Sequence, residues 1–457
     1  MTEQASGSLA RVLSPFEVVL LTLSALSPVL SVFIGGNAVL HMAGTGAALA
    51  FLLGGLFNAC FCLLYAEIGA AFPGAGGVYP ALSRLLGPRW SFAYIMLSVP
   101  ASFCLVAFSA LGLASYVHSL TPALPVIGIA VAGIALAGTI SILAIKRNAL
   151  ITGLFLAVEL VALLMLTGVA LVHMNAVPGD ILAHPVMLAQ NQLVATPPIT
   201  LALATIAGVW STAGGSWALY FAEEMQNVQQ KIGRVVAWVG VIAAAAIAVP
   251  LALVVLAIDD VPNILRSEAP IAAFLAHSAG PLVGTVMIVG VIAAIFNAII
   301  ATIMCQSRLL YATGRDGAFF GPINRLFARV HPRQQTPIGA VLALIIIASA
   351  LTLLGDQKLL ILISGNVSDY FMVGLAVWAG RRTGQTGLHF KAPLHPLVPL
   401  IGMLGGAGAI YADWADVAAG RPSIILLLGL FIAAALFYGW RRRQLGHDIV
   451  LSGTDGA

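Results

Sequence analysis

The first long apolar stretch of the chain, residues 16–41, is interrupted at its midpoint by residues that weaken a helix. A helix of about 20 apolar residues crosses a bilayer because it pairs its backbone groups internally. Pro28 has no N–H, so the carbonyl of Ser24 loses its helical partner, and Gly35 and Gly36 resist unwinding only weakly. Inside a bilayer, unpaired backbone groups are tolerated where they face protein or a hydrated cavity. The stretch therefore predicts a broken helix whose exposed carbonyls and amides form half of a binding site.

The composition of the whole chain sets its class. Apolar residues make up 60% of the 457 residues and charged residues 8%, against about 25% charged residues in an average soluble domain. We therefore expect an all-α protein that crosses the lipid bilayer many times. The net charge of +4 does not indicate a nucleic-acid partner, because the basic residues lie between the apolar runs. The N-terminal tail lacks a small-residue cleavage site, so we expect no cleaved signal peptide.

Apolar runs separated by short polar loops predict twelve transmembrane helices. Residues 1–15 and 441–457 are expected to form the two terminal tails. The predicted spans are residues 16–41, 46–71, 91–119, 123–145, 148–173, 199–222, 232–258, 281–312, 336–355, 358–380, 396–413 and 421–440.

Lys and Arg residues are distributed unevenly between the predicted loops. If the N-terminus lies in the cytoplasm, 18 of the 21 basic residues fall on the cytoplasmic side, and only Arg266, Lys358 and Arg421 fall outside. Cytoplasmic loops of membrane proteins carry this excess of positive charge. We therefore expect an even number of spans, with both termini cytoplasmic, in the cell (plasma) membrane.

The sixth predicted span is interrupted like the first. Small and hydroxylated residues fill Trp210–Trp217, where a spanning helix is usually rich in leucine. Two interrupted spans at matching places of two five-span units, residues 16–173 and 199–380, are typical of an inverted-repeat transporter with its site at mid-membrane. The alternative is that these small residues only let helices pack closely.

Several motifs resemble those of one known superfamily. They are Tyr65-Ala66-Glu67-Ile68-Gly69, Phe72-Pro73-Gly74-Ala75-Gly76-Gly77-Val78-Tyr79, Ala222-Glu223-Glu224-Met225-Gln226-Asn227 and Ser307-Arg308-Leu309-Leu310-Tyr311-Ala312-Thr313-Gly314-Arg315-Asp316-Gly317. Together they resemble the amino acid–polyamine–organocation (APC) superfamily of permeases over roughly residues 15–440. The resemblance implies a five-plus-five inverted repeat in residues 16–380, two additional helices in 396–440, and alternating access. It also implies proton-coupled uptake or exchange of amino acids or amines.

The resemblance also implies a substrate site. In the superfamily, the substrate ammonium lies against carbonyls of the two broken helices, and its carboxylate meets amides of the first. Carried over, the substrate-binding residues are Ser27, Leu30, Ser31, Val32, Trp210, Ala213, Gly214 and Ser216. Trp210 matches an aromatic residue that closes over the substrate in some relatives; the alternative is ordinary packing. The chain departs from the usual glycine-and-serine run of the first span, and bulkier residues there leave less room for a carboxylate.

Two acidic residues lie near the middle of predicted spans. Glu159 is in the fifth span and Asp369 in the tenth, and the sequence offers no Lys or Arg beside them. Ionisable residues at that depth indicate function, so we expect them to bind the coupling proton, with sodium as the alternative ion. Several proton-coupled relatives have a lysine near the position of Glu159. The structural alternatives are a neutral Glu159 bonded to a backbone carbonyl, and an Asp369 that shares a polar network with Ser364, Asn366 and Ser368.

Other polar residues give weaker indications. Asn297 and the third-span serines are candidates for either cavity contacts or helix packing. Glu67, Glu223, Glu224 and Asp316 lie at span ends among arginines, where we expect ion pairs that stabilise one access state.

These patterns favour a secondary active transporter of a small amino acid, driven by protons. An amine or polyamine permease or exchanger is the alternative, and a passive channel or facilitator is less favoured because the polar residues cluster at mid-depth. No convergent catalytic groups indicate an enzyme, and no cofactor is expected. Cys60, Cys62, Cys104 and Cys305 lack metal-ligand spacing. None lies in an outer loop to tether a protein partner, so no obligate partner is expected.

Overall fold

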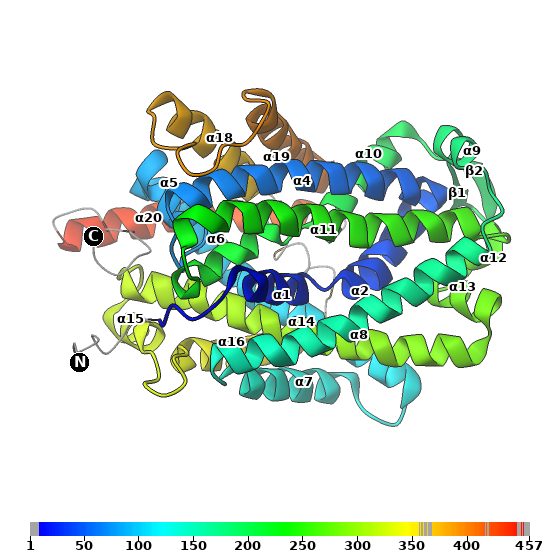
Figure 1. The fold of residues 1–457 in the computed structure, drawn as a ribbon, viewed down its shortest axis with the longest axis horizontal. Coiled ribbons are helices and arrows are strands. Elements are labelled where there is room, and N and C mark those ends of the chain that lie inside the picture. Colours follow the sequence, from blue (N-terminus) through cyan, green and yellow to red (C-terminus); the bar gives the residue numbers. More distant parts are fainter. Residues whose placement is uncertain are drawn as a thin grey trace.

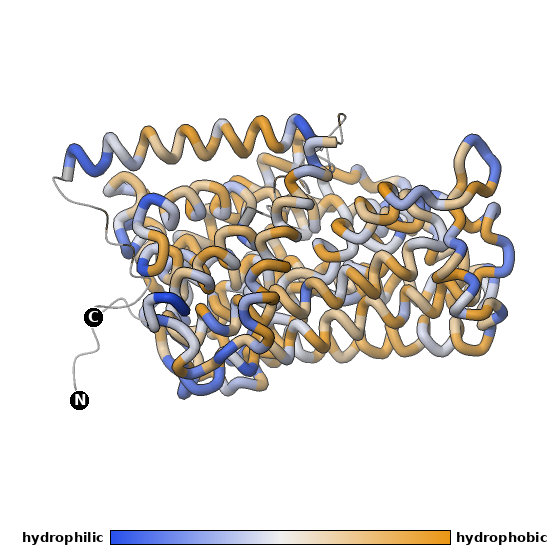
Figure 2. Tube along the Cα trace, turned by 90° about the horizontal axis from the view of Figure 1, so that it is seen from above, coloured by the Kyte–Doolittle hydropathy of each residue, from blue (hydrophilic) through white to orange (hydrophobic). Residues whose placement is uncertain are grey.

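Long helices run along one axis of the molecule in the computed structural model (Figure 1). The structure describes residues 9–355, 357, 360, 363, 368–415, 417, 420–445, 449 and 451. Figure 2 shows apolar residues along the middle of the bundle and hydrophilic residues gathered toward its two ends. This is the distribution expected of a protein whose middle lies in hydrocarbon.

The first predicted span consists of four consecutive helical pieces. They are α1 (Pro15–Leu26), α2 (Pro28–Leu30), the π-helix η1 (Ser31–Gly36) and α3 (Asn37–Ala43). Ser27 stands between the first two with φ 45°, so it forms the break. Its N–H donates to the carbonyl of Leu23 (2.9 Å), while its Oγ accepts from the N–H of Leu30 (3.3 Å). One residue thus caps both halves of the helix, and the break predicted from Pro28 is confirmed.

The sixth predicted span is also broken. It consists of α10 (Pro198–Thr212) and the 3₁₀-helix η3 (Gly215–Glu224). Ala213 between them is extended, and Gly214 has φ 134°, a conformation that strongly favours glycine. A Cβ atom on Gly214 would lie 3.0 Å from the side chain of Leu26. The two breaks therefore lie directly against each other.

The remaining long helices lie where spans were predicted. They are α4 (Ala47–Ala71), α6 (Pro88–Leu120), α7 (Val126–Ser141), α8 (Ile145–Val172), α11 (Val228–Ala257), α14 (Pro281–Arg315), α16 (Ile338–Thr352), α18 (Ser368–Arg382), α19 (Leu397–Ala415) and α20 (Gly420–Leu445). Shorter elements in the connections are η2 (Gly44–Gly46), α5 (Tyr79–Leu85), α9 (Pro178–Ala183), α12 (Val261–Arg266), α13 (Pro270–Ala279) and α15 (Gly321–Ala328). Among the described residues, eight continuous helical stretches are long and apolar enough to cross a membrane, with the first span and α4 counted together as Pro15–Ala71. Helices α7 and α16 are apolar but shorter. Most of the first half of the predicted span 358–380, with Ser364 and Asn366, lies outside the described residues.

One connection departs from the all-α prediction. Strands β1 (Val186–Ala189) and β2 (Gln192–Ala195) form an antiparallel hairpin in which Val186 pairs with Ala195 and Ala189 with Gln192. The two turn residues, Gln190 and Asn191, both have positive φ, which is the backbone geometry of a tight two-residue hairpin. The hairpin lies between α9 and α10 and leaves the helical bundle uninterrupted.

Helices α4 and α10 cross where glycines of the two helices meet. A Cβ atom on Gly54 would lie 2.6 Å from the backbone of Gly208, and one on Gly208 would lie 2.7 Å from the carbonyl oxygen of Ala50. Small residues allow such close backbone contact between membrane helices. The crossing holds the upstream half of the second broken helix against α4.

This crossing predicts a strong effect of a small change. We expect Gly208→Val to lower the free energy of unfolding by about 1–3 kcal/mol, because its contacts are backbone atoms that cannot rotate away. The matched control is Gly168→Val in α8, where an added Cβ meets nothing within 4 Å. Thermal unfolding of both variants in detergent measures the difference. Equal shifts in the two variants would contradict the close crossing.

Candidate functional site

A cavity of about 130 Å³ lies between the two breaks. Seven of the predicted site residues line it: Leu30, Ser31, Trp210, Ala213, Gly214, Ser216 and Asp369. The cavity is bounded further by α4, α6 and α14, whose contributing residues include Asn58, Tyr65, Phe108, Ser109 and Thr302. The structure therefore brings both broken helices and the acidic residue of α18 to one cavity.

Three predicted residues do not line this cavity. Val32 is fully buried in the apolar core. Ser27 is turned by its left-handed backbone toward α8, where its Oγ donates to the carboxyl of Glu159 at 2.9 Å. Glu159 is itself fully buried and lies behind the break rather than beside the cavity.

Side chains from neighbouring helices pair with carbonyls that the breaks leave without helical partners. The amide of Asn58 donates to the carbonyl of Thr212, the last residue of α10 (2.7 Å). The hydroxyl of Thr302 donates to the carbonyl of Ala25 (3.5 Å). Buried polar backbone groups need such partners. Asn58 and Thr302 therefore stabilise the breaks from outside, a role that the sequence did not reveal.

Asp369 provides the acidic group of the cavity. The hydroxyl of Tyr65 donates to its Oδ2 at 2.7 Å. The ring of Tyr370 stacks on Phe61 with centroids 4.2 Å apart, which holds α18 against α4 at this point. Of the described residues that line the cavity, Asp369 is the only carboxylate, and none is Lys or Arg. The cavity is therefore suited to a positively charged group.

Trp210 forms one wall of the cavity. Its ring meets Phe108 of α6 edge to face, with centroids 6.2 Å apart. Aromatic pairs of this geometry contribute about 0.5–1.5 kcal/mol beyond area burial. The indole is thus held in place beside the break, where it can cover a bound molecule.

Glu159 links three helices behind the first break. Its carboxyl accepts from Ser27 of the break at 2.9 Å and from the amide of Asn297 in α14 at 3.1 Å. The same amide also donates to the carbonyl of Thr152 (3.3 Å), whereas Oδ1 of Asn297 has no hydrogen-bond partner among the described residues. Among the described residues, no Lys, Arg or His side chain forms an ion pair with Glu159. The arrangement pairs a buried acid with an amide that has an unused acceptor.

Three ion pairs connect span ends, as the sequence indicated for Glu67, Glu223 and Glu224. Arg308 of α14 donates to both carboxylate oxygens of Glu224, at 3.0 and 3.1 Å, with both side chains 1% exposed. Arg315 pairs with Glu223 at 2.8 Å, and Arg381 pairs with Glu67. Asp316 forms the longer ion pair expected of it, with Arg315 at 3.8 Å, and also accepts from the hydroxyl of Tyr79 (3.0 Å). These pairs join η3 to α14 and α4 to α18.

The comparisons with known proteins identify the family. A family model described as "Amino acid permease" matches residues 13–447, nearly the whole chain. The chain belongs to the amino acid permease family. This confirms the resemblance to the APC superfamily, and it places the chain among transporters rather than enzymes.

Individual relatives are distant. The chain is 26% identical over 353 residues to the Asc-type amino acid transporter 1 of Homo sapiens, covering 72% of this chain and 63% of that protein. It is 25% identical over 389 residues to a branched-chain amino acid permease of Lactococcus lactis, covering 79% and 80%. It is 25% identical over 350 residues to a methylthioribose transporter of Bacillus subtilis, covering 73% of each. The match spans less than two thirds of the human protein's length.

Among the described residues, no group of three or more His, Cys, Asp or Glu residues could hold a metal ion. The four cysteines are free thiols, three of them buried and Cys60 half-buried. The polar groups at the cavity and behind the first break are backbone groups, hydroxyls, the amides of Asn58 and Asn297, and the carboxyls of Asp369 and Glu159.

Proposed function

We propose that this protein is a secondary active transporter of a small amino acid that works by alternating access and couples to protons. The observation that carries the proposal is the cavity between two adjoining helix breaks, with one acidic side chain on its wall. Membership of the amino acid permease family supports the class of substrate. The twelve-span topology, the inverted repeat and the cytoplasmic position of both termini in a plasma membrane belong to the same proposal.

The cavity supplies a place for each charged end of an amino acid. The carboxylate of Asp369 and backbone carbonyls near the breaks would attract the ammonium group. For the carboxylate, the amides of Leu30 and Ser31 at the start of the second half of the first helix are the candidate donors. Both are bonded to Ser27 in this structure (3.3 and 3.0 Å), so the carboxylate would have to replace Ser27 as their partner. The volume of about 130 Å³ favours a small substrate.

An amine or polyamine is the second candidate substrate. Asp369 lies on the wall, and no Lys or Arg is present among the described lining residues to bind a carboxylate. The names of the relatives include a branched-chain amino acid permease and a methylthioribose transporter, so the family does not fix one substrate. A passive facilitator of the same substrates is the third candidate.

Uptake into proteoliposomes separates these functions. The full-length protein is reconstituted, and labelled amino acids and amines are supplied with and without an imposed pH gradient. One pH unit corresponds to about 1.4 kcal/mol per proton, so a one-proton symporter can accumulate its substrate about tenfold. Accumulation of an amine but of no amino acid would favour the second candidate. Equilibration without accumulation would contradict active transport.

Glu159 provides the test of coupling. We expect Glu159→Gln to keep substrate exchange but to lose the roughly tenfold accumulation driven by one pH unit, because glutamine resembles the protonated acid and cannot release a proton. The control is Asp180→Asn, which removes one acidic charge from an exposed position in α9. The measurement compares counterflow with pH-driven uptake. Full pH-driven accumulation by Glu159→Gln would give Glu159 a structural role.

A further inference from the structure

A second cavity lies between the N-terminal end of α6 and the C-terminal half of α20. Its volume is about 640 Å³, and none of its described lining residues also lines the central cavity. An adjoining hollow of about 300 Å³ continues along Leu86–Pro88, the turn that precedes α6. Transport through the central cavity does not use this space, which therefore needs a separate explanation.

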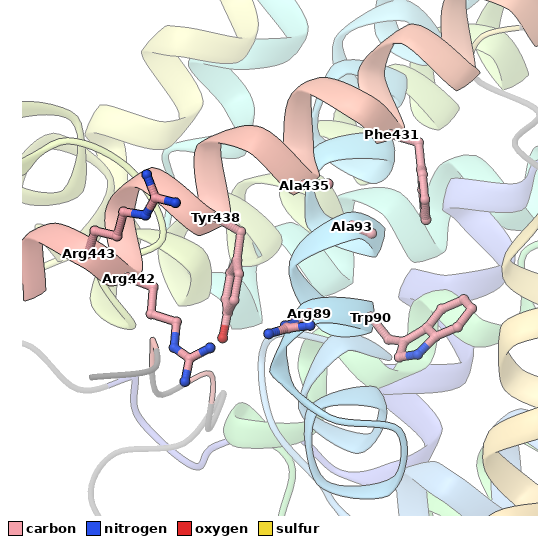
Figure 3. A pocket seen from close by; sticks show the side chains of 9 residues that line it. Arg89, Trp90, Ala93, Phe431, Ala435, Tyr438, Arg442 and Arg443 are labelled. Atoms are coloured by element: carbon pink, nitrogen blue, oxygen red, sulfur yellow. The ribbon is translucent and has the colours of Figure 1, made fainter. Parts of the chain in front are cut away.

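One part of this second cavity is strongly basic. Arg89 comes from α6, and Arg442 and Arg443 come from α20. Figure 3 shows that Arg89, Arg442 and the hydroxyl end of Tyr438 converge on one region from the two helices. None of the described residues that line the cavity is acidic, and the Arg89 side chain makes no ion pair or hydrogen bond within the described part of the chain. The planar guanidinium group of arginine binds phosphate oxygens through two parallel hydrogen bonds, so the basic part of the cavity is suited to a phosphate group.

The other part is apolar and open. Trp90 and Phe431 are 39% and 37% exposed, and Ala93 and Ala435 lie between them and the arginines. Figure 3 shows the two rings on the side of the cavity away from Arg442. The cavity thus has a charged end and an apolar end within one space. Its ligand must have the same two parts.

Helix α20 lies at the edge of the bundle, where lipid can reach it. Only 22% of the residues in its most apolar segment are buried, and Figure 2 shows this helix along one side of the molecule. Aromatic contacts of Phe92 with Phe437 and Tyr438, at 5.8 and 5.5 Å between centroids, hold its C-terminal half against α6. The apolar end of the cavity therefore lies between the N-terminal end of α6 and a helix, α20, that lipid can reach.

We propose that this cavity binds an anionic glycerophospholipid of the cytoplasmic leaflet. Its phosphate lies between Arg89 and Arg442, and an acyl chain runs past Trp90 and Phe431. The excess of basic residues places these arginines on the cytoplasmic side, and basic pockets between membrane helices on that side suit anionic lipid headgroups. Inorganic phosphate would fill only the charged end. A lipid accounts for both ends and joins α20 to α6.

The test uses the full-length protein in detergent and fluorescently labelled phosphatidylglycerol, whose binding is followed by anisotropy. We expect labelled phosphatidylcholine to bind much more weakly. The Arg89→Gln/Arg442→Gln variant should bind phosphatidylglycerol about 25-fold more weakly, at about fivefold for each charge. The matched control is Arg325→Gln/Arg329→Gln, which removes two exposed arginines of the same predicted side that do not line the cavity.

A second variant tests the cavity without changing charge. Gly439 lines it, and an added Cβ there would meet nothing within 4 Å, so a side chain can start at this position and Gly439→Leu extends into the cavity. We expect weaker phosphatidylglycerol binding in this variant as well. Equal losses in the two double-arginine variants, equal binding of phosphatidylcholine, or unchanged binding to Gly439→Leu would each overturn the proposal. Displacement of the labelled lipid by inorganic phosphate at comparable concentration would assign the site to free phosphate and overturn it too.

Discussion

Arg308→Met is expected to lower the free energy of unfolding by about 3–5 kcal/mol, the cost of leaving one partner of a buried ion pair alone. Arg308 and Glu224 are each 1% exposed, so water cannot replace the lost guanidinium. Arg308 also donates to the carbonyl of Met304 at 3.1 Å, and this bond is lost as well. Thermal unfolding of the full-length protein in detergent gives the measurement.

Two further variants make this test specific. The double variant Arg308→Met/Glu224→Leu removes both charges and should recover most of the loss, because two apolar residues can replace a buried ion pair at little cost. Arg315→Met is the matched single variant: Arg315 and Glu223 are 16% and 11% exposed, so a smaller loss is expected. If the double variant were as unstable as the sum of its two single variants, the coupling between Arg308 and Glu224 would be refuted.

Asp369→Asn is expected to weaken binding of the transported molecule by about 2–3 kcal/mol, or roughly 30- to 150-fold in Kd, because the substrate's ammonium group loses its charged partner. Asparagine keeps the size of the side chain and can still accept from the hydroxyl of Tyr65. The loss therefore reports charge rather than shape. Binding of the substrate identified in the uptake experiment is measured by calorimetry on the purified protein.

Controls on the same cavity separate charge from packing. Tyr65→Phe removes the hydrogen bond to Asp369 but leaves the carboxylate, so we expect a change of about 0.5–1.5 kcal/mol. Ser109→Ala alters another lining residue whose hydroxyl is already bonded to the carbonyl of Leu105 (2.9 Å), and it should bind nearly as the parent does. Unchanged binding by Asp369→Asn would remove Asp369 from the proposed site.

The sequence by itself determined the class of protein and the positions of both breaks. Pro28 removes a backbone donor, and Gly214 accepts a φ of 134°, and both effects act within a few residues of the chain. The ion-paired acids Glu67, Glu223, Glu224 and Asp316 were also predictable, since each lies near arginines at a span end. Local backbone chemistry and charge placement can be read from neighbouring residues.

Only the tertiary structure decided which side chains meet. Ser27 was expected at the substrate but bonds to Glu159, 132 positions away, and Tyr65 reaches Asp369 across 304 positions. The sequence also did not show that Arg89 and Arg442 line the same cavity. The physical reason is the solvent: a membrane helix is apolar toward lipid and toward protein alike, so its sequence carries no amphipathic stripe that fixes its rotation. Packing between helices sets that rotation, and with it the residues that form each site.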